Sequence, residues 1–157
     1  MTKLLLLIRH TQSAGIQGNK SDFERPLTAE GRTFANNLGA IILQKAFRPD
    51  YILSSSARRA RQTAELINKK LRIPEACQLF SDDLYTASAN NWRDQIGLLP
   101  SNASCVLLVG HNPTLSELAS SFTDANINLA PGGVIGFAYE IKHWYALNGI
   151  GKEIIRI

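Results

Sequence analysis

The stretch "LLLLIRHTQS", residues 4–13, indicates both the class of fold and the place of the chemistry. Its first five residues, Leu4 to Ile8, form a continuous apolar run, which is typical of a strand buried on both faces. Arg9 and His10 follow at once, although both groups are costly to bury without partners. We therefore expect a core strand whose end holds two polar side chains at a site.

A second stretch, "CVLLVGH" at residues 105–111, repeats this arrangement with another wholly apolar run followed by His111. Ligands of open α/β sheets bind beyond the carboxyl ends of the strands. If the two strands are parallel, His10 and His111 lie at the same edge of the sheet, although they are far apart in the chain.

A third strand, Tyr51–Ser54, is expected to end at this edge and to lead into a helix that begins near Ser55. Ala60 and Ala64 belong to the buried stripe of that helix, because apolar residues recur there at spacings of three and four. Arg59 lies close to this stripe in the first turn and can reach over the strand ends. The free amides of a helix N-terminus also favour an anion at this place.

The rest of the chain alternates between strand and helix patterns. Thr28 to about Ala46 is expected to be an amphipathic helix with Phe34 on its apolar face, and Asn112 and Pro113 are expected to open a helix as N-cap and first helical residue. Further strands are expected in "ACQLF" (76–80), "GGVIGFAYEI" (132–141) and "KEIIRI" (152–157), with a helix at 90–99 and a long loop at 11–27. This alternation predicts one α/β domain over residues 1–157, with a mainly parallel central sheet and helices on both faces.

Composition narrows the possible partners and the compartment. The net charge of +4 is mild and no long Lys/Arg block exists, so a nucleic-acid partner is not expected. The two cysteines, Cys77 and Cys105, lack metal-ligand spacing and suit a reducing compartment. The apolar run at residues 4–8 is too short for a signal peptide or a membrane span. We therefore expect a cytoplasmic protein without a membrane partner.

Two histidines, at least two arginines and helix N-termini at one sheet edge suit a phosphoryl group. The planar guanidinium of arginine matches phosphate oxygens, and a neutral imidazole can attack phosphorus and hold the phosphoryl group covalently. Neither carboxylates at the strand ends nor His/Cys spacings suggest a metal site. We expect no metal and no cofactor.

The ordered motifs of the chain resemble the histidine phosphatase superfamily, and in particular its small SixA-like branch of phosphohistidine phosphatases. The resemblance covers almost the whole chain and rests on "LIRHTQS" (7–13), "DFERPLTAEGR" (22–32), "PDYILSSSARRARQTAEL" (49–66), "DDLYTAS" (82–88) and "VLLVGHNPTLSELA" (106–119).

The resemblance implies a phosphoglycerate-mutase-like fold and a role for each matching residue. His10 would be the nucleophile that becomes phosphohistidine, and Arg9 and Arg59 would clamp the phosphoryl oxygens. His111 would add a cationic hydrogen bond, and Arg25 in "ERPL" would reach the phosphate pocket.

Two positions depart from the wider family pattern. Thr11 replaces the glycine that usually follows the R-H pair, and we expect no loss of activity from it, because the SixA-like branch tolerates small residues there. The proton donor is open between Asp83, the nearest match to the family carboxylate, and Asp22. A donor is also unnecessary if the leaving group is the imidazole of a phosphohistidine, whose ring nitrogen can already be protonated.

The sequence thus predicts a metal-independent phosphohistidine phosphatase that acts on a phosphorylated protein. A chain of 157 residues leaves little room for the insertions that close a substrate pocket in larger members, so an open site is expected. Two alternatives remain: the same machinery acting on a small phosphate ester, with the loop at 11–27 closing over it, and a phosphate- or phosphoprotein-binding module without turnover.

Overall fold

A six-stranded sheet forms the centre of the computed structural model, which describes all 157 residues. The strand order is β3-β2-β4-β1-β5-β6. The first four of these are parallel, whereas β5 runs antiparallel to β1 and β6 antiparallel to β5. The predicted, mainly parallel sheet is therefore confirmed. The strands are β1 (Thr2–Arg9), β2 (Tyr51–Ser55), β3 (Gln78–Ser81), β4 (Cys105–Gly110), β5 (Val134–Glu140) and β6 (Lys152–Arg156).

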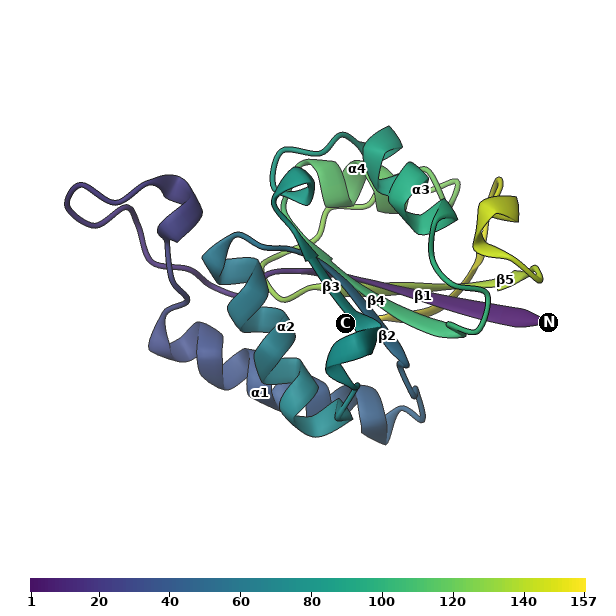
Figure 1. Ribbon diagram of the computed structural model, residues 1–157, viewed down its shortest axis with the longest axis horizontal. Coiled ribbons are helices and arrows are strands. Elements are labelled where there is room, and N and C mark those ends of the chain that lie inside the picture. The colour runs from purple at the N-terminus through teal and green to yellow at the C-terminus, as the bar shows by residue number, and fades with distance from the viewer.

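Helices cover both faces of this sheet, as the wholly apolar central strands require. Figure 1 shows α1 and α2 together on one face and α3 and α4 on the other. Each layer closes a hydrophobic cluster against the sheet, one of 14 and one of 21 buried residues. None of the helices has the length and apolar character needed to cross a bilayer. The helices are α1 (Ala29–Gln44), α2 (Arg58–Leu71), α3 (Ala89–Gly97) and α4 (Thr114–Ser120).

The register between β1 and β4 brings the two predicted histidines together. Arg9 is paired with Gly110 at the end of the ladder, so the next residue of each strand is a histidine. The amide of His10 donates to the carbonyl of Gly110 at 3.0 Å, which continues the ladder by one bond. The parallel arrangement therefore places His10 and His111 at one edge, as predicted.

Helix α1 differs from the expectation in which residues it buries. Phe34 is 46% exposed, whereas the buried face consists of small and medium side chains: Gly31, Ala35, Leu38, Gly39 and Ile42. Small residues let α1 approach α2 closely, since a Cβ on Gly39 would lie 2.6 Å from the carbonyl oxygen of Ile67. Phe34 instead packs on Gly132, where an added Cβ would lie 2.6 Å from its ring. The predicted core position of Phe34 is wrong for this reason.

The start of α4 also differs from the expectation. The N-cap position is taken by Pro113, and no side chain caps this helix. The side chain of Asn112 makes two other hydrogen bonds. Its Nδ2 donates to the carbonyl of Leu129 at 2.8 Å, and its Oδ1 accepts from Ser116 Oγ at 2.7 Å. The amide of Asn112 therefore ties the loop before β5 to α4 instead of capping the helix.

The long loop at 11–27 begins and ends as a narrow ribbon. The amide of Ala14 donates to Pro26 O at 2.8 Å, and the amide of Thr28 donates to Gln12 O at 3.0 Å. Beyond this ribbon the chain projects from the body of the molecule and carries the short helix η1 (Asp22–Glu24) (Figure 1). The loop thus brings polar residues beside the sheet edge without closing over it.

Candidate active site

His10 and His111 form the centre of the site. Their ring centroids lie 5.3 Å apart at the carboxyl edge of β1 and β4, with the ring planes at 56°. Each ring follows the end of a buried strand that has a neighbouring strand on both sides: β1 lies between β4 and β5, and β4 lies between β2 and β1. The geometry brings together the two imidazoles that the sequence predicts at this edge.

Hydrogen bonding fixes the tautomer of His10. Its Nδ1 lies 2.7 Å from the carbonyl oxygen of Thr11, which can only accept, so Nδ1 carries the proton and Nε2 keeps its lone pair. The residue is only 7% exposed. Burial, reinforced by the positive charges of Arg59, Arg9 and Arg25, lowers the pKa of His10 to about 4. His10 is therefore neutral at neutral pH, with a lone pair on Nε2.

His111 is neutral as well when the site holds no anion. Burial, followed by the effects of His10 and Arg59, lowers the pKa of His111 to about 3. Its Nε2 lies 2.8 Å from Ser55 Oγ, whereas its Nδ1 is buried and has no hydrogen-bond partner. The cationic hydrogen bond expected of His111 therefore requires the negative charge of a bound phosphate, which would raise this pKa.

Arg9 is held by the loop that precedes β5. Its Nη1 donates to the carbonyl of Leu129 at 3.0 Å, the same oxygen that Asn112 contacts. Burial lowers the pKa of Arg9, but a guanidinium stays protonated at neutral pH. Its Nε is buried without a partner. Arg9 therefore keeps a donor free beside His10.

Arg59 enters the site from the first turn of α2 and is 5% exposed. Its Nη1 donates to the backbone carbonyl of Asp22 at 2.8 Å, and its Nη2 donates to the carboxylate of Asp22 at 3.1 Å. Its Nε is buried and unpaired, like that of Arg9. Arg58, the residue before it on the helix, makes no such contact.

Arg25 and Asp22 come from the projecting loop and complete the charged cluster. Arg25 Nε lies 2.9 Å from Asp22 Oδ1, an ion pair whose angles are not those of a hydrogen bond. Asp22 also accepts a hydrogen bond from the Tyr85 hydroxyl, and this bond, together with Arg59 and Arg25, lowers the pKa of the Asp22 carboxyl. Of the two candidate proton donors, the structure brings Asp22 into the cluster, as a carboxylate.

Asp83 lies outside this cluster. Its side chain is exposed and makes no contact with the histidines or arginines of the site. It lines a surface pocket with residues of α3, and its backbone N–H donates to Ser81 Oγ at 3.3 Å. The structure therefore does not bring Asp83 to the groups with which a proton donor would have to cooperate.

Tyr85 is a site residue that the sequence patterns do not predict. Its ring meets His111 edge-on at 5.5 Å between centroids, and the guanidinium of Arg59 lies 5.7 Å from its ring centre. Its hydroxyl bonds Asp22, and this bond raises the pKa of the phenol. A signal was available, since Tyr85 belongs to "DDLYTAS" and follows β3, another parallel strand that ends at this edge.

The donors left unpaired describe what the site can hold. Buried polar groups nearly always have partners, so buried donors without one mark the place of a missing acceptor. Five buried side-chain polar atoms make no hydrogen bond, and four of them belong to this cluster: the Nε atoms of Arg9, Arg25 and Arg59 and Nδ1 of His111. Of these four, Arg25 Nε has an ion-pair partner in Asp22. The fifth atom, the hydroxyl oxygen of Tyr139, lies apart in the hydrophobic core. An anion with several oxygens matches the donors of the cluster. No group of three His, Cys, Asp or Glu side chains is arranged to hold a metal ion.

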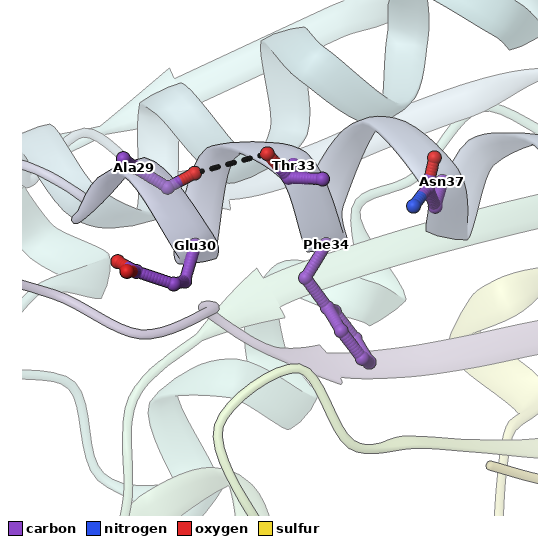
Figure 2. Close-up of a pocket in the computed structure, with 5 residues that line it drawn as sticks. All are labelled: Ala29, Glu30, Thr33, Phe34 and Asn37. Carbon is purple, nitrogen blue, oxygen red and sulfur yellow. Dashed lines mark hydrogen bonds between the residues drawn. The ribbon is translucent and has the colours of Figure 1, made fainter.

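A separate pocket of about 410 Å³ lies on the outer face of α1 (Figure 2). Thr33 donates to the carbonyl of Ala29 there at 3.1 Å, and the Phe34 side chain points away from the helix axis. This pocket contains a carboxylate, Glu30, and none of the basic residues of the cluster. It is therefore not a phosphate site.

Comparisons with known proteins agree with this geometry. A family model described as "Histidine phosphatase superfamily (branch 1)" matches residues 5–80. An uncharacterised protein of Picosynechococcus sp. is 30% identical over 139 residues, which cover 84% of this chain and 82% of the relative.

Solved structures show the same fold. A candidate phosphohistidine phosphatase SixA from Agrobacterium tumefaciens superposes with a TM-score of 0.78 at 25% identity, over 86% of this chain and 90% of that one. A second candidate SixA, from Nakamurella multipartitia, gives a TM-score of 0.87 at 22% identity over 100% of this chain and 96% of that one. With the site and these matches together, the chain belongs to the histidine phosphatase superfamily.

Proposed function

We propose that this protein is a phosphohistidine phosphatase that removes phosphoryl groups from another protein through a covalent intermediate on His10. One observation carries the proposal. A neutral histidine with a free Nε2 lies among buried donors that have no acceptor: Nε of Arg9 and of Arg59, and Nδ1 of His111. A nucleophile surrounded by unpaired donors is suited to phosphoryl transfer, which depends mainly on positioning and on stabilising negative charge.

The reaction follows from these groups in two steps. In the first, the lone pair of His10 Nε2 attacks phosphorus while the bond from phosphorus to the leaving nitrogen breaks, and that nitrogen keeps the bonding pair. Arg9, Arg59 and His111 donate to the three equatorial oxygens, where charge develops. In the second, water attacks the phosphohistidine, the bond to Nε2 breaks, and inorganic phosphate leaves. Arg25 adds positive charge at the outer side of the cluster.

The state of the carboxylates favours a phosphohistidine substrate. Asp22 is held ionised by Tyr85 and two arginines, and Asp83 lies elsewhere, so no protonated carboxylic acid faces the cluster. An alkoxide leaving group needs such an acid, whereas the imidazole of a phosphohistidine can leave already protonated on its other nitrogen. The SixA proteins of similar fold are named for this activity.

The open edge of the site favours a protein as the carrier of that group. The loop at 11–27 projects from the body of the molecule (Figure 1). Asp22, at the outer side of the cluster, keeps 43% of its side chain exposed. A phosphorylated side chain on a protein surface can reach such a site.

A substrate comparison tests the proposal. Histidine peptides phosphorylated with phosphoramidate are compared with p-nitrophenyl phosphate, a phosphoserine peptide and a panel of sugar phosphates, with kcat/KM as the readout. We expect the phosphohistidine peptide to be preferred, with no change on adding a chelator. Higher kcat/KM for one small ester would favour the alternative of a metabolite phosphatase and contradict the proposal.

Trapping the intermediate tests the chemistry separately from the substrate. Denaturation during turnover of a labelled phosphodonor should leave acid-labile, base-stable phosphate on wild-type protein and none on the His10→Ala variant. His143→Ala is the matched control, because His143 bonds Ser101 far from the cluster and should leave labelling unchanged. Phosphate binding without label or turnover would indicate a binding module instead.

A further inference from the structure

Ser55 makes a contact to His111 that the proposed reaction does not use. It is the last residue of β2 and is fully buried. Its Oγ lies 2.8 Å from His111 Nε2 and accepts the backbone N–H of Ala57 at 3.2 Å. This oxygen makes no other hydrogen bond. Ser55 is thus joined both to the start of α2 and to a site histidine.

Two arrangements of protons fit the contact between Ser55 and His111. In the first, the Ser55 hydroxyl donates to Nε2, and His111 carries its own proton on Nδ1. In the second, Nε2 donates to Ser55 Oγ, which then accepts two N–H groups. The Ser55 hydroxyl proton is left without an acceptor in the second arrangement, inside a fully buried residue. A buried donor without an acceptor is unfavourable, so the first arrangement is favoured.

The first arrangement leaves one donor of His111 free. Its Nδ1–H is buried and has no partner, and it belongs to the same cluster as the unpaired Nε atoms of Arg9 and Arg59. The second arrangement would place a lone pair there, which repels the oxygen of an anion. Because His111 is neutral in the free site, its ability to donate to phosphate depends on which nitrogen holds its single proton.

We propose that Ser55 is a positioning residue that sets the tautomer of His111, so that the free Nδ1–H of His111 faces the oxygens of the phosphoryl group. The fold then sets the two histidines in complementary ways. The carbonyl of Thr11 leaves His10 with a lone pair on Nε2 for attack, and the hydroxyl of Ser55 leaves His111 with a proton for donation. The inference rests on the proposed function only in taking phosphate as the anion.

The tautomer can be read directly by NMR. In ¹⁵N-labelled protein, long-range ¹H–¹⁵N spectra separate pyrrole-type from pyridine-type ring nitrogens. The chain has three histidines, and His111→Gln identifies the signals of His111 by their loss. We expect Nδ1 of His111 to be pyrrole-type in the wild type, with Nε2 becoming pyrrole-type in Ser55→Ala. A wild-type His111 protonated on Nε2 would overturn the proposal.

Binding of inorganic phosphate and of vanadate measures the consequence. Ser55→Ala should weaken both on the order of ten- to a hundredfold, since it removes one hydrogen bond to a charged group. Ser55→Thr retains the hydroxyl and should restore both the wild-type tautomer and most of the affinity.

Ser54→Ala is the matched control. Ser54 is also fully buried on β2, but its hydroxyl donates only to the carbonyl of Ser55 at 2.8 Å. This variant should keep both the tautomer and the affinity. An equal loss of affinity in Ser54→Ala and Ser55→Ala, or a loss in Ser55→Ala with the tautomer unchanged, would show that the serines act only through the structure of β2.

These measurements separate the inference from the proposed function. They use the free protein with phosphate and vanadate, and no substrate is turned over. If the wild type hydrolysed no phosphohistidine but kept the expected tautomer and its dependence on Ser55, the proposed function would fail and this inference would stand. If the wild type turned over phosphohistidine normally but His111 had the opposite tautomer, this inference would fail and the proposed function would stand.

Discussion

Replacing Asp22 with asparagine should make the protein bind inorganic phosphate more tightly. In the free site the carboxylate of Asp22 pairs with Arg59 Nη2 at 3.1 Å and with Arg25 Nε at 2.9 Å. A phosphate ion needs the same two cations and is repelled by this carboxylate. Asparagine is nearly the same size and can still accept from the Tyr85 hydroxyl, so the change removes charge and little else.

The size of the effect follows from the exposure of the pair. The Asp22 side chain is 43% exposed, so solvent screens each ion pair, and a pair of this kind contributes about 0.2–1 kcal/mol. Two pairs together give roughly 0.4–2 kcal/mol, which corresponds to about a two- to thirtyfold lower Kd for phosphate. Isothermal titration calorimetry at low and high salt measures this change, which should shrink at high salt.

The same variant decides whether Asp22 is the proton donor. Because Tyr85 and two arginines hold the pKa of Asp22 low, we expect the rate of His10 phosphorylation from a phosphohistidine peptide to stay near that of the wild type in Asp22→Asn. Asp83→Asn is the matched control and should change neither the phosphate Kd nor the rate. Unchanged or weaker phosphate binding in Asp22→Asn would refute competition for the arginines. A hundredfold lower rate would identify Asp22 as the general acid.

Three further predictions test the cluster and its support. Arg59→Ala should lower kcat/KM by about 10²–10³-fold, because it removes donors from the developing charge, whereas Arg58→Ala should have little effect. The free energy of unfolding, measured by urea titration, should fall as the pH drops from 6.5 towards 4. His10 and His111 have pKa values of about 4 and about 3 in the folded protein and the ordinary 6.5 when unfolded, so the unfolded chain binds more protons in this range. His111→Gln should weaken this dependence on pH. Gly31→Ala should lower the Tm and the activity, because its Cβ would lie 2.1 Å from Gln12 O, while Gly15→Ala, with open space around it, should be neutral.

The position of the histidines could be predicted because it depends only on strand pattern. Wholly apolar strands in a sheet covered on both faces are typical of parallel pairing. Parallel strands end at one edge, and the residue after the end of β1 and of β4 is a histidine. Arg59 could be predicted for a similar reason, since its place on α2 relative to the buried alanines determines the side on which it lies. The spacing of apolar residues is thus sufficient to predict the place of a side chain that depends only on the path of the backbone.

The contacts around Asp22 could not be predicted in this way. Asp22 lies in an irregular loop before α1, whereas Tyr85 follows β3, far along the sequence. The bond between them depends on how the loop places Asp22 against Arg59. Phe34 shows a related limit. It has the right spacing for the core, but the close contact of α1 with α2 is made at Gly39, a position that a hydrophobic pattern does not reveal.

Burial of the strand ends also determines the chemistry of the site, not only its geometry. A solvent-exposed histidine beside three arginines would still be partly protonated near its ordinary pKa, and a protonated imidazole cannot attack phosphorus. Burial of His10 and His111 lowers both pKa values well below neutrality, so both rings are neutral and each proton must be assigned to one nitrogen. The Thr11 carbonyl makes that assignment for His10, and Ser55 is proposed to make it for His111. In the free site the carboxylate of Asp22 balances part of the positive charge of Arg25 and Arg59, and we expect a bound phosphate to take its place.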